Sequence, residues 1–211
     1  AVSTVAGLTS ALANTAVGHI VLASGTYYLS AQLSVTRSIV LEAAVAGSVV
    51  LDAQASSSTW RRVLWINLGS LDVVQLVGLN ITGGYDAGGG GVFVRSGTVT
   101  MTSCSITGNT ATGGCGYGCA AGGGVNVASG TVTLSSCTIT GNTAANGGGV
   151  FVYEGAVTIS SSTISGNTAP WGPSNVIVQG GTVCSWATTL TGVLGTVSAC
   201  PAPPPPSPPP Y

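Results

Sequence analysis

The sequence predicts an all-β protein, a parallel β-helix with about 25 residues per coil, from three observations. Near-identical segments recur: GGGVFVRSGTVTMTSCSITGNTA ending at Ala111, GGGVNVASGTVTLSSCTITGNTA ending at Ala144, and GGGVFVYEGAVTISSSTISGNTA ending at Ala169. Within each segment, apolar and polar residues alternate in short runs, as they do in strands. Glycine or Gly-Asn separates these runs. Three short strands per repeat suit one coil that stacks on the previous coil at about 4.8 Å.

Residues 1–18 differ from the repeats and predict a short helix that caps the N-terminal end of the coils. The apolar residues of this segment follow helical spacing: Val5, Leu8, Leu12 and Ala16. Ser3 is expected to be the N-cap. The helix would cover backbone groups that invite aggregation when they are left unpaired. Residues 19–200 are then expected to form the coils.

Equivalent positions of the repeats predict columns of stacked side chains inside the coils. One column holds Val92, Val125, Val150 and Val176, and a second holds Ile106, Ile139, Ile164 and Leu190. Asparagine recurs at one corner, at Asn109, Asn142 and Asn167. Asparagine tolerates a left-handed backbone, and stacked amides can form hydrogen bonds from coil to coil.

Residues 201–211, PAPPPPSPPPY, form a separate C-terminal tail. Proline lacks the backbone N–H that a sheet requires, so this segment cannot add a strand. We expect a polyproline II rod that is roughly 30 Å long.

The stretch IVLASGTYYLSAQLSVTRSIVLEA, followed by the GGGV…SGTVT…SCSITGNTA repeats, resembles the right-handed parallel β-helix proteins of the pectin-lyase-like superfamily. It is most similar to the non-enzymatic, repeat-rich surface proteins of that group. The resemblance covers roughly residues 1 to 198 and implies a right-handed coil.

The tail sequence PPPPSPPP resembles the hydroxyproline-rich glycoproteins of green-algal cell walls and ciliary hairs, the mastigonemes. This second resemblance implies that the contiguous prolines are hydroxylated and carry short arabinose-rich chains. The residues expected to be modified are Pro201, Pro203, Pro204, Pro205, Pro206, Ser207, Pro208, Pro209 and Pro210. A bare proline linker, or a ligand for a proline-binding domain, is the alternative.

The charge content excludes several classes of function. Only 4% of the residues are charged, with four arginines and no lysine, so we expect no nucleic-acid partner and no membrane insertion. The carboxylates Asp52, Asp72, Asp86, Glu42 and Glu154 lie apart in the sequence. We therefore expect no catalytic residues, no metal site and no cofactor, and we interpret the acids and the Arg61–Arg62 pair as solvated surface charges. His19 is expected to be an ordinary junction residue.

Six cysteines in a short chain favour an oxidising, extracellular location. Cys115 and Cys119 are close enough in sequence for a local disulfide, and Cys184 and Cys200 could clamp the C-terminal end. Cys104 and Cys137 occupy the same inward position of neighbouring coils, and they either bond or remain buried thiols.

Two further features also bear on location. Asn80-Ile81-Thr82 is an N-glycosylation sequon, and Asn80 is expected to face outward. No signal peptide is visible at Ala1, which suggests that such a segment has already been removed.

Two outward-facing surfaces suggest functions. Thr98/Thr100 and Thr131/Thr133 form T-x-T pairs that could bind ice, although the array breaks at Ala156 and Cys184. An aromatic and apolar stripe is expected to form an interface for a second copy or for the tail. Its residues are Trp65, Phe93, Phe151, Tyr153 and Ile177.

Together these features predict a secreted, non-enzymatic structural glycoprotein that builds a fibre, a cell wall or a ciliary coat. It would self-assemble through lateral or tail-mediated contacts and carry covalent glycans. The alternative is a carbohydrate- or ice-binding module on a proline stalk, and an enzyme that cleaves polysaccharide is the third possibility.

Overall fold

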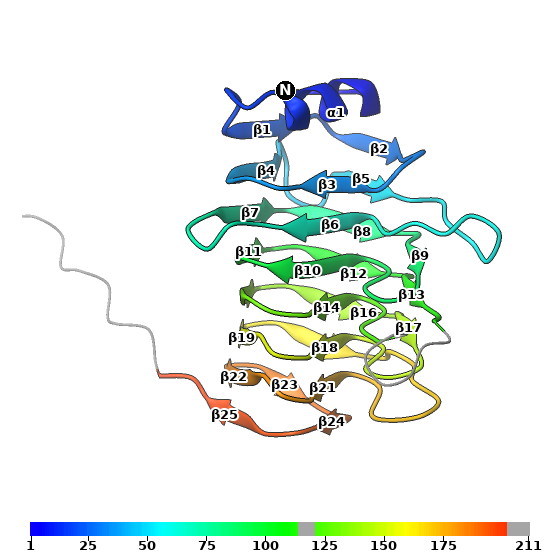
Figure 1. The fold of residues 1–211 in the computed structure, drawn as a ribbon, viewed down its shortest axis with the longest axis vertical. Coiled ribbons are helices and arrows are strands. Elements are labelled where there is room, and N and C mark those ends of the chain that lie inside the picture. Colours follow the sequence, from blue (N-terminus) through cyan, green and yellow to red (C-terminus); the bar gives the residue numbers. More distant parts are fainter. Residues whose placement is uncertain (114–120, 202–211) are drawn as a thin grey trace, which may run out of the picture.

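Parallel strands in stacked sheets make up the protein, and one short helix, α1 (Val5–Ala13), lies at the N-terminal end of the described chain (Figure 1). The computed structural model describes residues 1–113 and 121–201. The expected Cys115–Cys119 disulfide and the expected rod over residues 202–211 lie outside the described residues.

Within the described residues, three long sheets account for most of the strands. The eight strands of sheet A are β1 (His19–Leu22), β4 (Ile39–Ala43), β7 (Val73–Val77), β11 (Thr98–Thr102), β15 (Thr131–Ser135), β19 (Ala156–Ser160), β22 (Thr182–Trp186) and β25 (Val197–Ala199). The seven strands of sheet B are β2 (Gly25–Tyr28), β5 (Val49–Asp52), β8 (Leu79–Thr82), β12 (Ser105–Thr107), β16 (Thr138–Thr140), β20 (Thr163–Ser165) and β23 (Thr189–Leu190). The seven strands of sheet C are β3 (Leu33–Val35), β6 (Leu64–Asn67), β10 (Val92–Ser96), β14 (Val125–Val127), β18 (Val150–Val152), β21 (Val176–Val178) and β24 (Val193–Leu194). A fourth, small sheet contains β9 (Tyr85–Asp86), β13 (Thr110–Ala111) and β17 (Thr143–Ala144).

The chain visits the long sheets in the repeating order A, B, C, and each strand pairs in parallel with the strand from the previous visit. We call one such pass a rung. The pairing register confirms the predicted columns, because Val92 pairs with Val125, Val125 with Val150, and Val150 with Val176. Ile106, Ile139, Ile164 and Leu190 pair in the same way in sheet B.

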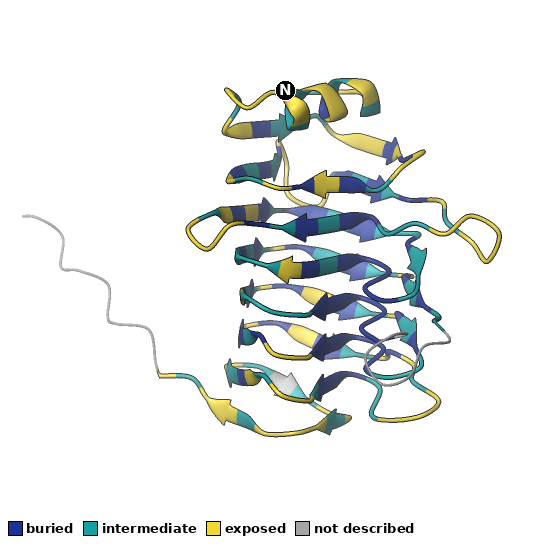
Figure 2. Ribbon diagram, in the orientation of Figure 1, coloured by how far each residue is buried: buried dark blue, intermediate teal, exposed yellow. Residues whose placement is uncertain are grey.

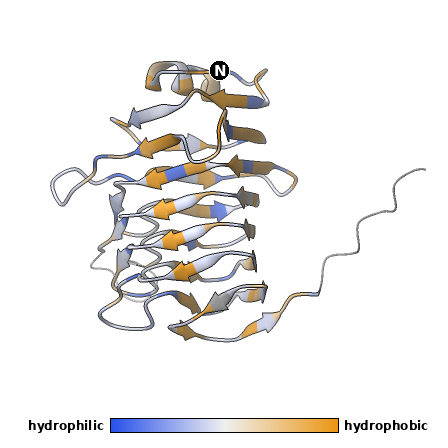
Figure 3. Cartoon of the chain, turned by 180° about the vertical axis from the view of Figure 1, so that it is seen from behind, coloured by the Kyte–Doolittle hydropathy of each residue, from blue (hydrophilic) through white to orange (hydrophobic). Residues whose placement is uncertain are grey.

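The core lies inside the stacked rungs. Strands alternate buried and more exposed residues, as β5 and β11 do, because successive side chains point to opposite faces (Figure 2). Hydrophobic residues recur at the same strand positions from rung to rung (Figure 3). The first three members of each column are fully buried, so repeated sequence positions become one continuous apolar core.

An asparagine ladder runs through the corner between sheet B and the small sheet. Asn109 and Asn142 are fully buried, and the Asn109 amide donates to Asn142 Oδ1 at 3.0 Å. Asn142 donates in turn to Asn167 Oδ1 at 3.0 Å, as the sequence predicts. The explanation through a left-handed asparagine backbone is wrong, because the preceding glycines, Gly108 and Gly141 among them, carry the positive φ. The ladder also has a member that was not expected, Asn175, which accepts from Asn167 Nδ2 at 2.9 Å.

Helix α1 packs on the first rungs through Leu8, which is fully buried. The predicted N-cap is wrong by one residue: Thr4, not Ser3, accepts a hydrogen bond from the Gly7 N–H at 3.1 Å. Arg37 fixes the other end of the helix, because its guanidinium donates to the carbonyls of Ala11, Leu12 and Asn14. These carbonyls belong to the last turn and the cap, where the helix itself leaves acceptors unpaired.

Candidate functional site

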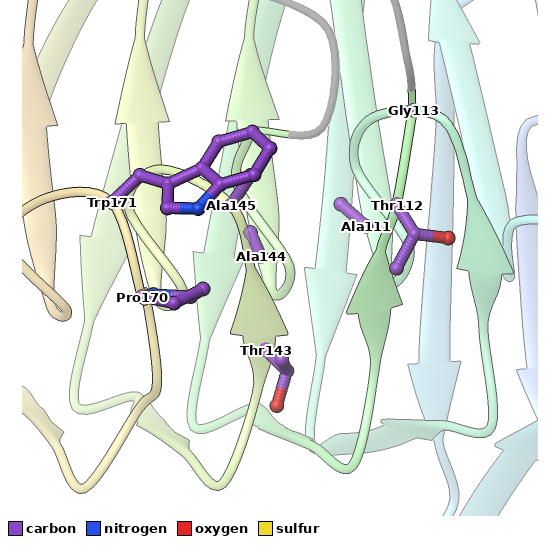
Figure 4. Close-up of a pocket in the computed structure, with 8 residues that line it drawn as sticks. All are labelled: Ala111, Thr112, Gly113, Thr143, Ala144, Ala145, Pro170 and Trp171. Carbon is purple, nitrogen blue, oxygen red and sulfur yellow. The ribbon is translucent and has the colours of Figure 1, made fainter.

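An apolar pocket lies beside the small sheet and spans three rungs (Figure 4). Its volume is about 380 Å³, and its floor includes Ala144 of β17. Ala111 and Thr112 lie on one side, and Pro170 and Trp171 lie on the other. The backbone N–H of Trp171 donates to the Ala145 carbonyl at 3.2 Å, and this bond holds the loop that carries Trp171 against the neighbouring rung.

The chemistry of this pocket is neutral and mostly apolar. Within the described part of the chain, none of its lining residues is charged, and its polar side chains are Thr112, Thr143 and the indole of Trp171. The Trp171 side chain is strongly exposed, at 77%. The hydroxyl of Thr112 is buried and has no hydrogen-bond partner within the described part of the chain. An uncharged ligand with apolar surface and hydrogen-bond acceptors fits these groups.

Sequence reasoning missed this pocket, although a signal was present. In the second repeat the residues after Thr143 read AANGGGV, whereas the third repeat continues APWGPSNV. This change replaces part of a glycine corner with an exposed tryptophan between two prolines, Pro170 and Pro173.

The aromatic stripe is stacked in register on sheet C, but its predicted exposure is wrong for two of its residues. Phe93 pairs with Trp65, and Phe151 pairs with Ile177. Phe151 and Ile177 are only 4% and 5% exposed, because they pack with Ala121 from the loop that precedes β14. Alternation along a strand shows which side chains point away from the core, but it does not show whether a loop covers them.

The remaining stripe residues are not equally open to solvent. Trp65 and Phe93 are half-buried, and Tyr153 is 43% exposed. The Arg62 guanidinium lies over the Phe93 ring, 4.9 Å from its centroid. The role of these residues as an interface stays a prediction.

The interpretation of Arg61 and Arg62 as solvated charges is wrong. Arg62 forms an ion pair with Asp86 at 2.8 Å and donates from Nε to the Gly88 carbonyl at 2.7 Å. Burial lowers the pKa of the Arg62 guanidinium from its ordinary value, and the charge of Asp86 acts in the opposite direction. Arg61 donates to the carbonyls of Leu29 and Ala53, so both arginines hold neighbouring rungs together.

The carboxylates are separated along the stack, and Glu42, Asp72 and Asp86 each have their own partners. Glu42 lies 2.8 Å from Nε2 of His19, and Asp72 accepts from the Ser38 hydroxyl at 2.8 Å. Among the described residues, no group of three or more His, Cys, Asp or Glu side chains is arranged to hold a metal ion.

The Cys184–Cys200 disulfide is present, and it joins β22 to the end of β25 with a Cα–Cα distance of 4.9 Å. Cys104 and Cys137 are both free and buried. Interaction with the neighbouring Cys137 thiol, together with burial, raises the pKa of the Cys104 thiol above its ordinary value. Each thiol donates to backbone carbonyls, Cys104 Sγ to Leu76 at 3.4 Å and Cys137 Sγ to Met101 at 3.3 Å.

We expect Cys104 and Cys137 to resist thiol reagents in the folded protein, because their exposed fractions are 2% and 1%. In a Cys115→Ser/Cys119→Ser background, an Ellman assay should detect almost no thiol before denaturation and two thiols after it. A further Cys137→Ser change should reduce the second value to one. Rapid labelling of the folded protein, or no thiol after denaturation, would contradict this prediction.

Asn80 and the threonine pairs lie on the outer faces of the sheets, where they were expected. Asn80 is half-buried on β8, and its Nδ2 donates to the Gly47 carbonyl at 2.7 Å. In sheet A, Thr100, Thr133 and Thr158 pair in register on successive rungs. Sheet B carries a second array that was not predicted, in which Ser105, Thr138 and Thr163 pair.

Over the described ranges, no helix has the length and apolar character needed to cross a membrane. The comparisons with known proteins found no match to a protein-family model, to a curated protein sequence or to a solved structure.

Proposed function

We propose that the chain is a right-handed parallel β-helix of about 25 residues per coil. Support comes from the repeated A, B, C order of the parallel strands, with each strand pairing to the previous rung. Connections between parallel strands of one sheet are right-handed in nearly all proteins, which favours that hand here. The resemblance of the repeats to the pectin-lyase-like superfamily agrees with this assignment.

The function that we propose is that of a non-enzymatic, structural extracellular glycoprotein, a subunit of a fibre, a cell wall or a ciliary coat. The observation that carries the proposal is the Cys184–Cys200 disulfide. It ties Cys200, which directly precedes the first proline of the tail, Pro201, to β22 of sheet A. Disulfides persist in oxidising compartments, and a polyproline II rod is a stiff spacer. The clamp would therefore join a rigid stack of rungs to a rigid arm.

The outer surface supports the same proposal. The chain is almost uncharged, and hydroxyl side chains occupy outward positions on sheets A and B. Such a surface is compatible with a dense, neutral carbohydrate matrix, because it neither repels nor attracts the matrix through charge.

Ice or carbohydrate binding remains the second candidate, and the register of Thr100, Thr133 and Thr158 favours it. Neighbouring rungs repeat at about 4.8 Å, so these hydroxyl groups form a regular row. A measurement of thermal hysteresis on the purified chain would support the ice-binding alternative.

The main test is the mass of the Pro201–Tyr211 peptide released from protein that its native cells have secreted. We expect pentose increments on hydroxylated prolines, and we expect them to disappear when the cells are treated with a prolyl-hydroxylase inhibitor. The peptide that carries Asn80 serves as a comparison, because N-linked sugars do not depend on that enzyme. A tail without any modification would contradict the glycoprotein proposal.

A further inference from the structure

We propose that the pocket beside Trp171 binds the proline-rich tail, residues 201–211, of a second copy of this chain, in its unglycosylated form. The inference rests on the proposed function as a subunit of an extracellular assembly, and it adds a receptor for the unmodified tail. Successive copies would then be linked from the tail of one to the flank of the next.

The chemistry of the pocket selects this occupant. Proline-rich segments dock into grooves lined by aromatic residues, because the proline rings pack on the aromatic face and the extended backbone has little conformational entropy left to lose. Trp171 supplies such a face, and Ala111, Ala144 and Pro170 complete the apolar walls. The indole N–H of the exposed Trp171 can donate to a backbone carbonyl of the tail, whose prolines present acceptors only.

A free sugar is a poorer match to the same walls. Sugar rings carry many hydroxyl groups, and each one that enters the pocket without a partner costs free energy. Among the described residues that line the pocket, the side chains that could serve as partners are Thr112, Thr143 and the indole of Trp171. The lining residues that the structure describes carry no charge, which agrees with a tail that has no charged side chain.

The spacing of the rungs also matches the tail. A polyproline II helix repeats every three residues, or about 9.3 Å along its axis. Residues 111–113, 143–145 and 170–171 come from three successive passes of the chain, so the pocket spans two rung spacings, about 9.6 Å. A rod that lies along the stack would therefore place prolines one turn apart against equivalent positions of the first and third rungs.

The position of the clamp favours a second copy over the chain's own tail. Ala199 ends β25 in sheet A, and the disulfide holds Cys200 beside it. The small sheet and its pocket lie on the opposite side of the stack from β25 (Figure 1). A stiff rod that starts at Pro201 would have to bend around the stack to reach its own pocket. Contact between a tail and a different surface of the next copy does not close on itself, so it builds an open filament.

Sedimentation of the full-length chain, expressed with its disulfide but without glycans, tests the inference. We expect association that depends on concentration and that the synthetic peptide PAPPPPSPPPY displaces. The Trp171→Ala variant should weaken association at least about tenfold, the size expected when an aromatic anchor is removed from an interface. The matched control is Trp60→Ala, because Trp60 is also exposed, at 52%, but lies outside the pocket. We expect its association to stay within about twofold of the original chain.

Competition with other ligands identifies the occupant. The peptide with arabinosylated hydroxyprolines should fail to compete, because the sugars are too polar and too bulky for the pocket. Equal association of the Trp171→Ala and original chains, each with the same melting temperature, would overturn the proposal. Competition by arabinose oligosaccharides but not by the bare peptide would also overturn it. The glycoprotein function is tested separately by the pentose increments. Because a tail that carries them could not enter the pocket, this contact would form only between copies whose tails are unmodified, and each proposal can fail without the other.

Discussion

Replacing Asn142 with alanine is expected to lower the free energy of unfolding by about 3–5 kcal/mol. The Asn142 side chain is fully buried in the centre of the asparagine ladder. Its Oδ1 accepts from both the backbone N–H and the Nδ2 of Asn109, each at 3.0 Å. Its Nδ2 donates to the Ile106 carbonyl at 2.8 Å and to Asn167 Oδ1. Alanine would leave the buried Asn109 backbone N–H without its partner, which costs about 1–3 kcal/mol. It would also remove the bonds to Asn109 Nδ2, the Ile106 carbonyl and Asn167 Oδ1, which contribute about 0.5–1.5 kcal/mol each.

Urea unfolding followed by circular dichroism measures this loss, and Asn80→Ala is its matched control. Asn80 is half-buried and donates to the Gly47 carbonyl from the outer face of β8, so its loss should cost about 1 kcal/mol or less. Hydrogen exchange adds a second measurement. Because rungs contact only their neighbours, Asn142→Ala should lower protection most strongly in the rungs on either side of it. Equal destabilisation by the two variants would show that the ladder has no special role.

The side-chain columns and the asparagine ladder could be predicted from sequence, because each repeat places the same kind of residue at the same inward position. Val92, Val125 and Val150 fill one inward position, and parallel pairing then forces them into one column. Asn175 could not be predicted in the same way. It follows Asn167 by only eight residues in a degenerate repeat, and it replaces the ladder member that the next GNTA corner would have supplied.

The surface was harder to predict than the core. Strand alternation correctly places Phe151 and Ile177 on the outer face of sheet C, but the packing of Ala121 over them depends on how a loop folds back. The same limit applies to Arg62, whose partners Asp86 and Phe93 lie 24 and 31 residues further along the chain. The Trp171 pocket needs three rungs to form, so no single repeat contains it.

Gly124 belongs to a glycine run that directly precedes a strand of sheet C. We expect Gly124→Ala to lower the free energy of unfolding by about 3 kcal/mol or more. A Cβ at position 124 would lie 2.7 Å from the carbonyl oxygen of Gly149 in the next rung and 3.1 Å from Asn142 Nδ2. The first of these atoms is backbone in a paired rung, so the added methyl group cannot be accommodated by rotating a side chain. Relief requires separating the rungs, which would also stretch the bond between the Val125 N–H and the Gly149 carbonyl, now 2.9 Å.

Two matched glycines separate this steric cause from backbone strain. Gly141 has a φ of +65° and no atom within 4 Å of an added Cβ, so alanine there should cost only about 1–2 kcal/mol, the penalty of a left-handed residue. Gly18 also has open space around an added Cβ and lacks a left-handed φ, so Gly18→Ala should change stability by about 0.5 kcal/mol at most. Urea unfolding of the three variants should therefore give the order Gly124, Gly141, Gly18 from most to least destabilised. A Gly124→Ala protein as stable as Gly141→Ala would show that the rungs can separate at little cost. The glycine runs would then serve backbone conformation, with close approach of the rungs playing no part.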